Sequence, residues 1–222
     1  MDIRVAPDEA AAGVVAAQWA ASQLRNSVRR RGVASFAVSG GSTPIAMFAD
    51  LVRRDVPWPR VGIWQVDERV APAGDPARNA LLLEVFDGTG VTVRPMPVTA
   101  RRLSTAAARY AAALPARFDV VHLGLGDDGH TASWPPDDPV IDSPAPVALC
   151  GLYNGYVRMT LTPSIVNAAR HRLLLAPGAG KAEPLRRWLL GDRALPVQRV
   201  RRANTVVVID AAAAAQLPFA GG

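Results

Sequence analysis

The segment 124–133, Gly-Leu-Gly-Asp-Asp-Gly-His-Thr-Ala-Ser, combines residues that carry out acid–base chemistry with glycines that let the chain turn tightly. It follows the apolar run 120–123, which predicts a buried strand. Ligands of open α/β sheets bind beyond the carboxyl ends of the strands, and this segment follows such an end. Asp128 and His130 flank a single glycine, so the carboxylate can lie beside the imidazole and orient it as a general base. The segment therefore predicts a catalytic site centred on His130.

The same segment matches the Gly-x-Gly-x-x-Gly pattern of dinucleotide-binding folds. In those folds the pyrophosphate lies on a helix N-terminus, whereas Pro135 and Pro136 leave little room for a helix here. Asp127 and Asp128 would repel the phosphates, and the pattern lies beyond the middle of the chain rather than in a first βαβ unit. These features argue against a dinucleotide site.

A second candidate site is the turn 39–43, Ser-Gly-Gly-Ser-Thr, which follows a predicted strand and precedes a helix beginning at Pro44. Glycines let backbone N–H groups approach a ligand, hydroxyls add donors, and a helix N-terminus adds positive potential. The turn predicts a phosphate cradle, with a tight turn capped by Ser or Thr as the alternative. It lacks the lysine of a P-loop and the final glycine of a nucleophile elbow. The cradle would consist of Gly40, Gly41, Ser42 and Thr43.

Charged residues follow or open two other predicted strands. Asp67, Glu68 and Arg69 end the apolar run 61–66, and three adjacent charges indicate a place outside the core, either in the site or in a solvated turn. Arg158 opens a later strand, where its guanidinium could bind a phosphate through two hydrogen bonds or simply mark an edge strand.

Lys181 is the only lysine among 25 Lys and Arg residues, and it stands in a Gly-rich turn that opens a helix. A lysine that persists where arginine has replaced all others indicates a position whose geometry arginine cannot reproduce. Its survival by chance at the surface is the alternative.

The remaining histidines and the cysteine have no catalytic context. His122 lies inside an apolar strand and is expected to be packed, whereas His171 lies between two arginines and is expected at the surface. Cys150 ends an apolar run and is expected to be a core thiol. Because no Cys/His cluster has metal-binding spacing, we expect no metal site.

Composition narrows the class of protein. The chain has 222 residues, half of them apolar, and a formal net charge of +6, which could attract anionic metabolites. The basic runs 29–31, 101–102 and 199–202 are not interleaved with aromatic residues, so we interpret them as solvated faces and expect no nucleic-acid partner. We find no apolar stretch near the roughly 20 residues of a membrane span, no signal peptide and no cysteine pair. We therefore expect a soluble cytoplasmic protein without a membrane partner.

Strands and helices alternate along the chain, and several strands are apolar throughout. Strands are predicted at 34–38, 61–66, 91–93, 120–125, 157–161, 172–175 and 205–209. Helices are predicted at 10–31, 44–53, 79–86, 102–114 and 182–190, with a terminal helix from 211. This alternation predicts a single domain spanning 1–222, with an α/β, doubly wound, mostly parallel sheet and helices on both faces, of Rossmann-like type.

Taken together, these motifs resemble the 6-phosphogluconolactonases, within the superfamily that they share with glucosamine-6-phosphate deaminases. The resemblance is carried by 39–44, 67–70, Asn79, 124–133, 158–162 and Gly180-Lys181, in this order. It implies hydrolysis of 6-phosphoglucono-δ-lactone to 6-phosphogluconate, the second step of the pentose phosphate pathway, without a cofactor. It also implies a small-molecule partner and a monomer or small homo-oligomer.

The deaminase branch differs at two places. It uses a glutamate five residues after the histidine, where this chain has Pro135, and it shows Asp-Glu-Tyr where this chain has Asp67, Glu68 and Arg69. Both departures favour the lactonase. A glucosamine-6-phosphate deaminase or isomerase and a non-enzymatic sugar-phosphate sensor remain the alternatives. A sensor needs no oriented histidine and usually carries a DNA-binding segment, for which we find no helix-turn-helix candidate and no spare residues.

The resemblance assigns expected roles. His130 activates water, Asp128 holds the imidazole, and Asp67 contacts sugar hydroxyls. Arg69 or backbone N–H groups of the glycine turn stabilise the oxyanion. The 6-phosphate is held by Ser42, Arg158 and Lys181.

Overall fold

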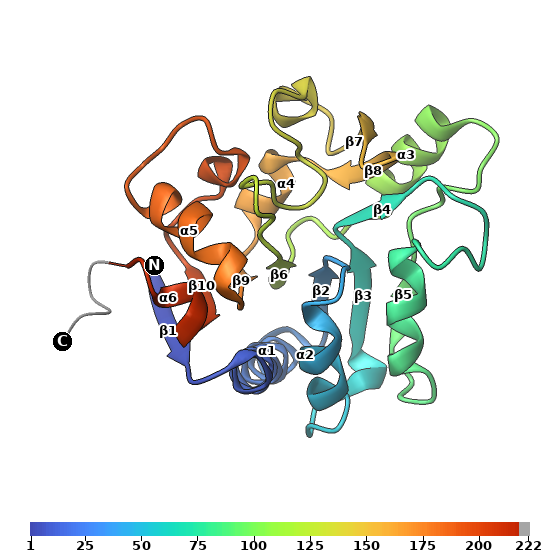
Figure 1. Cartoon of the computed structure of the whole chain (residues 1–222). Helices are drawn as coiled ribbons and strands as arrows, with labels where there is room; N and C mark the ends of the chain where they lie inside the picture. The colour runs from blue at the N-terminus through green and yellow to red at the C-terminus, as the bar shows by residue number, and fades with distance from the viewer. Residues whose placement is uncertain (218–222) are drawn as a thin grey trace.

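The computed structural model of the chain describes residues 1–217. At its centre lies a seven-stranded parallel sheet in the order β1-β10-β9-β6-β2-β3-β5 (Figure 1). Its strands are β1 (Asp2–Ala6), β2 (Ala34–Val38), β3 (Val61–Gln65), β5 (Thr92–Arg94), β6 (Val120–Leu123), β9 (His171–Leu175) and β10 (Thr205–Asp210).

Helices cover both faces of this sheet. One face packs against α1 (Glu9–Arg31) and α2 (Pro44–Leu51), and the other against α3 (Leu103–Ala112), α5 (Ala182–Leu189) and α6 (Ala211–Ala214). Successive strand residues point to opposite faces, so Phe36 and Val38 pack with the first group of helices and Ala37 with the second. The predicted α/β, doubly wound, mostly parallel fold is confirmed.

A second sheet lies beyond the carboxyl ends of the central strands and was not predicted. It contains β4 (Asp67–Arg69), β8 (Tyr156–Leu161) and β7 (Val147–Tyr153), all antiparallel, in the order β4-β8-β7. The register of β4 and β8 places Arg69 opposite Arg158. This sheet therefore brings the two predicted arginines together from positions far apart in the sequence.

Other elements also escaped the sequence patterns. The edge strand β1 is mostly exposed and carries charges, so it lacks the apolar run that identified the inner strands. The short helix α4 (Pro163–Ala168) went unpredicted, and residues 79–86 form a 3-10 helix, η2 (Asn79–Phe86). The other 3-10 helices are η1 (Trp58–Arg60), η3 (Pro139–Asp142), η4 (Ala179–Lys181) and η5 (Pro196–Arg199).

The expectation that the charges at 67–69 lie outside the core is wrong for Asp67 and Glu68. Glu68 is fully buried and pairs with Arg78, whose Nε lies 3.1 Å from its carboxylate. The carboxylate also accepts hydrogen bonds from the backbone N–H groups of Arg69, Asn79 and Ala80 and from the Gln65 side chain. A carboxylate with this many donors can be buried without a large penalty, and it anchors the loop before η2 to β4.

The residues outside the predicted site behave largely as expected. His122 is buried, and desolvation lowers its pKa to about 3, which keeps it neutral. Cys150 is a buried thiol whose pKa burial raises to about 11. His171 was expected at the surface, and this expectation is wrong. Its ring is half-buried, and its centroid lies 6.0 Å from that of the Trp19 ring. Within residues 1–217, no helix combines the length and the apolar character that crossing a membrane requires.

Candidate active site

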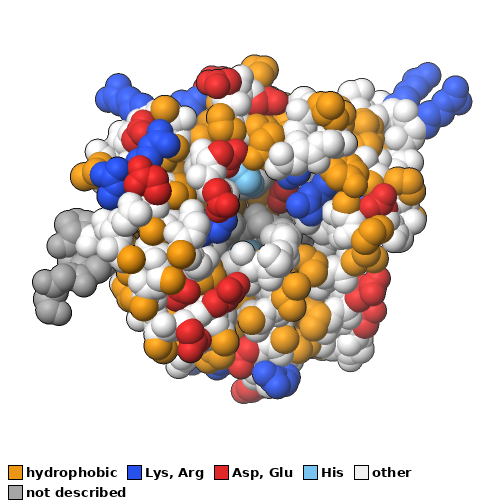
Figure 2. All heavy atoms as spheres, viewed as in Figure 1, with side chains coloured by type: hydrophobic (Ala, Val, Ile, Leu, Met, Phe, Trp, Pro, Cys, Tyr) orange, Lys and Arg blue, Asp and Glu red, His pale blue; other side chains and the backbone are white. Residues whose placement is uncertain are grey.

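The predicted site residues converge on one cavity of about 190 Å³ at the carboxyl ends of β2, β3 and β6. Figure 2 views this face, on which a hollow lies near the centre among acidic, basic and histidine side chains. The cavity is lined by Gly40, Gly41, Ser42, Thr43, Asp67, Arg69, His130, Arg158 and Lys181, among others. Asp128 is the one predicted site residue outside this lining, and it contacts His130 from behind. A second cavity of about 530 Å³ shares Ser42, Arg69 and Arg158, so a ligand can extend from one into the other.

The core of the site is the pair of His130 and Asp128, whose Nδ1 and Oδ1 atoms lie 2.6 Å apart. The backbone N–H of His130 also donates to this Oδ1, at 3.1 Å. Gly129, at φ 82°, lets the chain turn back, and Gly126 leaves room for the ring. A Cβ atom at position 126 would lie 1.9 Å from Nδ1 of His130. Because Asp128 engages Nδ1, the other ring nitrogen, Nε2, is available to a ligand.

Tyr153, which sequence reasoning missed, completes this pair. Its hydroxyl donates to Oδ2 of Asp128 at 2.5 Å and lies 3.1 Å from Nδ1 of His130. Tyr153 ends β7, a strand without a clear sequence pattern, 23 residues after His130. No signal in the sequence connects the two positions, since only the unpredicted second sheet brings them together.

The electrostatics of the trio favour an ionised Asp128 beside a neutral Tyr153. Burial raises the pKa of Asp128, but hydrogen bonds from Tyr153 and from the ring and backbone of His130 outweigh it, so the pKa is lowered overall. Burial and the neighbouring Asp128 carboxylate raise the pKa of Tyr153 to about 12. Tyr153 therefore remains a proton donor to a carboxylate that stays charged.

Two arginines form the opposite wall. Arg69 donates from Nη1 to the carbonyl of Ala77 at 3.0 Å and to Oδ1 of Asn79. The Arg158 guanidinium is buried and lies over the Tyr153 ring, 5.0 Å from its centroid. Two guanidinium groups beside one cavity create a strong attraction for an anion.

Asn79 belongs to the motif of the resemblance but was given no role. Its Nδ2 donates to the backbone carbonyl of Asp67 at 3.0 Å, while its Oδ1 accepts from Arg69. Gly40 packs so closely that a Cβ there would lie 2.0 Å from Oδ1 of Asn79. Asn79 thus fixes Arg69 and links the glycine turn to β4.

Among residues 1–217, Asp67 is the one carboxylate that lines the cavity. It is buried, and Oγ of Ser133 donates to its Oδ2 at 2.7 Å. Burial raises its pKa, and the Ser133 hydrogen bond and the nearby Arg69 and Arg158 offset this only in part. A carboxyl group of this kind suits hydrogen bonds to hydroxyls of a neutral ring.

The glycine turn and Lys181 supply the remaining polar groups. Thr43, the N-cap residue of α2, makes no hydrogen bond of its side chain to the helix, so the capped-turn alternative is not observed. Oγ of Ser39 is buried without a protein partner at the same turn. Lys181, at the end of η4, donates from Nζ to Oδ1 of Asp127 at 2.5 Å. The Asp127 side chain is 75% exposed, so this ion pair is weak and the ammonium can exchange it for a ligand anion.

The arrangement therefore combines an oriented imidazole with groups that suit a phosphate, namely the glycine turn and the side chains of Arg69, Arg158 and Lys181. Acid–base chemistry at a carbonyl of a phosphorylated, hydroxyl-rich molecule fits this combination. Within residues 1–217, no group of three or more His, Cys, Asp or Glu side chains is placed to hold a metal ion.

Comparison with known proteins agrees with this geometry. Residues 7–209 match the family model of glucosamine-6-phosphate isomerases/6-phosphogluconolactonase. The 6-phosphogluconolactonase of Rhizobium meliloti is 36% identical over 197 residues, which cover 82% of this chain and 85% of the relative. That of Streptomyces coelicolor is 33% identical over 220 residues, covering 85% and 84%.

Solved structures give the same result. The crystal structure of a 6-phosphogluconolactonase from Shewanella baltica is similar with a TM-score of 0.87 and 29% identity, covering 95% of this chain and 97% of that one. A monomeric glucosamine-6-phosphate deaminase reaches a TM-score of 0.81 at 17% identity, which shows a common fold alone. The chain belongs to the family of glucosamine-6-phosphate isomerases and 6-phosphogluconolactonases.

Proposed function

We propose that this protein hydrolyses 6-phospho-D-glucono-1,5-lactone to 6-phospho-D-gluconate, in the oxidative branch of the pentose phosphate pathway. The observation that carries this proposal is the His130–Asp128 pair, which faces a cavity walled by Arg69, Arg158 and Lys181. The relatives named 6-phosphogluconolactonase support the choice of substrate. Pro135, where the deaminase branch has a glutamate, supports the lactonase over the deaminase.

In the mechanism that we propose, Nε2 of His130 takes a proton from a water molecule as its oxygen bonds to the lactone carbonyl carbon. The carbonyl oxygen becomes an oxyanion, stabilised by Arg69 or by backbone N–H groups of the glycine turn. The tetrahedral intermediate then expels the ring oxygen, which receives the proton from the imidazolium. Asp128 stabilises that imidazolium throughout.

Substrate binding in this proposal rests on the phosphate. The phosphate is held by the cradle of Gly40, Gly41, Ser42 and Thr43 and by the side chains of Arg158 and Lys181, which reach the same cavity from separate elements. Asp67 accepts hydrogen bonds from sugar hydroxyls. Contacts remote from the carbonyl thereby orient the reacting atoms. The single cysteine supports a reducing, cytoplasmic location, and we expect a monomer or small homo-oligomer.

The test is hydrolysis of the phosphorylated lactone beside unphosphorylated glucono-1,5-lactone. We expect kcat/KM to be about 10³-fold higher for the phosphorylated lactone, because hydrogen bonds to charged groups contribute about 1.5–3 kcal/mol each. Acid release followed at constant pH measures both rates. Equal rates on the two lactones would contradict the phosphate site, and ammonia release from glucosamine 6-phosphate would favour the deaminase.

Tyr153→Phe tests the role of the hydroxyl in positioning the pair. Its hydrogen bond helps to lower the pKa of Asp128, so its removal raises that pKa and Asp128 becomes protonated at higher pH. The hydroxyl also lies 3.1 Å from Nδ1 of His130, so its loss leaves both members of the pair less firmly held. We expect the plateau kcat to fall by about tenfold or less.

Tyr156→Phe is the matched control, because it removes a hydroxyl from the same hairpin of β7 and β8 at the rim of the adjoining cavity, whereas the hydrogen bonds to Asp128 and His130 come from Tyr153. An unchanged plateau kcat in Tyr153→Phe, or an equal fall in the control, would show that the hydroxyl does not position the pair.

A further inference from the structure

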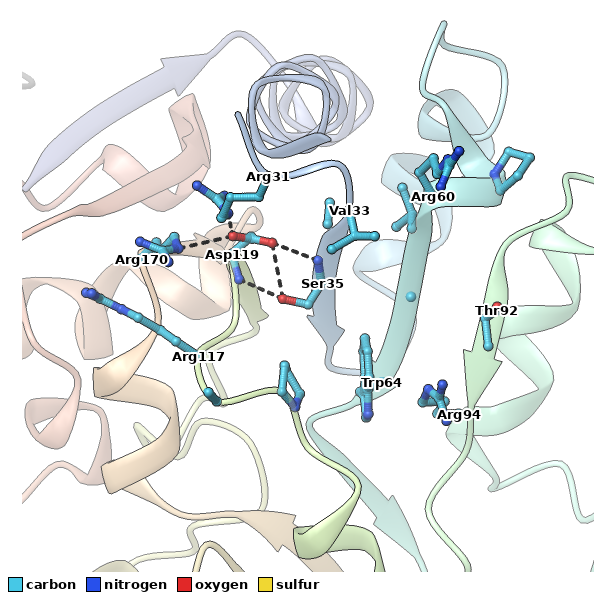
Figure 3. Close-up of a pocket in the computed structure, with 16 residues that line it drawn as sticks. Arg31, Val33, Ser35, Arg60, Trp64, Thr92, Arg94, Arg117, Asp119 and Arg170 are labelled. Carbon is cyan, nitrogen blue, oxygen red and sulfur yellow. Dashed lines mark hydrogen bonds and ion pairs between the residues drawn. The ribbon is translucent and has the colours of Figure 1, made fainter. Parts of the chain in front are cut away.

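Another hollow, of about 490 Å³, lies at the amino ends of the central strands, whereas the catalytic cavity lies at their carboxyl ends. It is formed at the amino ends of β2 and β3 and just before β6, where Ala34, Val61 and Asp119 line it (Figure 3). The catalytic groups follow the carboxyl ends of the same strands. The two sites are therefore separated by the length of a strand, roughly 15 Å for five residues.

Arginines dominate the lining of this hollow. They come from five separate parts of the chain: Arg31, Arg60, Arg94, Arg117 and Arg170. Asp119 is the single carboxylate among the lining residues. After one arginine is balanced by Asp119, most of the positive charge of the hollow remains uncompensated, in a chain whose formal net charge is +6.

Asp119 holds two of these arginines in place. It is buried, accepts from the backbone N–H of Ser35 at 2.8 Å, and contacts Arg31 Nη2 at 2.5 Å and Arg170 Nε at 3.2 Å. Residues 29–31 are exposed, as expected of a solvated face, and Arg31 also contacts Asp119. The arginines are held before a ligand arrives, which reduces the entropy lost on binding.

Two further guanidinium groups are partly fixed as well. Nε of Arg117 donates to the backbone carbonyl of Ala168 at 2.6 Å, which leaves its terminal nitrogens for other partners. The Arg94 guanidinium lies 5.3 Å from the centre of the Trp64 ring. Arg60 makes no hydrogen bond to a described residue through its side chain, so it can turn toward a ligand.

Figure 3 shows these arginines in two groups on either side of the hollow. Arg31, Arg117 and Arg170 lie on one side and Arg60 and Arg94 on the other. Ser35, Val33 and Trp64 lie between the groups. An anion that engages both groups must therefore be extended, with negative charge along its length.

We propose that this hollow binds a chain of two or more phosphates, carried by inorganic tripolyphosphate or by a nucleoside triphosphate. The planar guanidinium group binds phosphate oxygens through two parallel hydrogen bonds. A single phosphate carries about two negative charges at most and would leave one group of arginines unbalanced. The volume of the hollow lies within the range of small-molecule sites, about 300–1,000 Å³.

Isothermal titration calorimetry without divalent cations tests the proposal with three probes: tripolyphosphate, ATP and orthophosphate. The test variant is Arg60→Glu/Arg117→Glu, which reverses one charge in each group. Its matched control is Arg101→Glu/Arg102→Glu, which changes the net charge equally at exposed residues outside the hollow. Lys181→Ala reports binding in the catalytic cavity instead.

We expect tripolyphosphate or ATP to bind the unsubstituted protein at least about tenfold more tightly than orthophosphate. Binding should weaken by about tenfold or more in Arg60→Glu/Arg117→Glu and stay within about twofold in the control and in Lys181→Ala. Equal affinity for tripolyphosphate and ATP would show that the site recognises the phosphates alone. Tighter binding of ATP would show that the nucleoside also makes contacts. Both results support the proposal.

The proposal is overturned if the unsubstituted protein binds neither tripolyphosphate nor ATP, or if it binds orthophosphate as tightly as it binds them. It is also overturned if Arg60→Glu/Arg117→Glu binds like the control, or if Lys181→Ala abolishes binding. Circular dichroism melting shows whether the test variant folds, and Arg60→Ser/Arg117→Ser repeats the measurement with a smaller change. Because the readout is binding, the outcome is independent of the lactonase activity.

Discussion

His130→Ala is expected to lower kcat for the phosphorylated lactone by about 10²–10⁴-fold, the usual contribution of a positioned acid–base group. Among residues 1–217, the imidazole is the one titratable group that lines the cavity with a free nitrogen while a fixed carboxylate holds its other nitrogen. KM should change little, because the groups proposed to hold the phosphate remain. Steady-state kinetics measures both constants, and circular dichroism verifies the fold.

Two companion variants sharpen this prediction. Asp128→Asn keeps the shape of the side chain but removes the charge that stabilises an imidazolium, so kcat should also fall. His171→Ala is the matched control, because His171 begins β9 at the amino end of the strand, opposite the end that carries the proposed catalytic groups, and its loss should leave kcat unchanged. Near-normal turnover in His130→Ala would rule out the general base.

Gly126→Ala should inactivate the enzyme as severely as a direct change to the pair, although position 126 carries no reactive group. The added Cβ would lie 1.9 Å from Nδ1 of His130 and 2.7 Å from Oδ1 of Asp128. The ring and the carboxylate must both move, and a displacement of about 1 Å at a reacting group can cost about 10²-fold in rate. We expect kcat to fall by at least about this factor.

Gly151→Ala is the control for the general effect of adding a methyl group. Position 151 lies in β7, and the nearest atom to its Cβ would be Oδ2 of Asp138 at 3.3 Å, so that carboxylate must move by only a few tenths of an ångström. Its kcat should remain close to that of the unsubstituted protein. If Gly126→Ala retains full turnover, then the close fit of Gly126 against His130 is not needed for catalysis.

Local patterns were enough to predict the central sheet, because its inner strands are buried on both faces. The runs 34–38 and 120–125 are apolar without alternation, which is the pattern of a parallel sheet under helices on both sides. The pair of Asp128 and His130 could also be predicted, because two residues in one tight turn are neighbours whatever the rest of the chain does.

The features that the sequence patterns did not predict depend on contacts between segments far apart in the chain. Glu68 is buried because Arg78 and the N–H groups of Asn79 and Ala80 meet its carboxylate, and no spacing in the sequence encodes that meeting. Tyr153 reaches Asp128 because β7 pairs with β8 and β8 with β4, a non-local arrangement. The second sheet thus carries the parts of the site that composition and periodicity could not reveal.

The isolation of Lys181 has a practical consequence. It is the only lysine of the chain, its side chain is 21% exposed, and it lines the catalytic cavity. A reagent that acylates amines therefore has one side-chain target in this sequence, besides the α-amino group of the N-terminus, and that target lies where substrate is proposed to bind. A label attached there is a site-specific probe of cavity occupancy, obtained without engineering the chain.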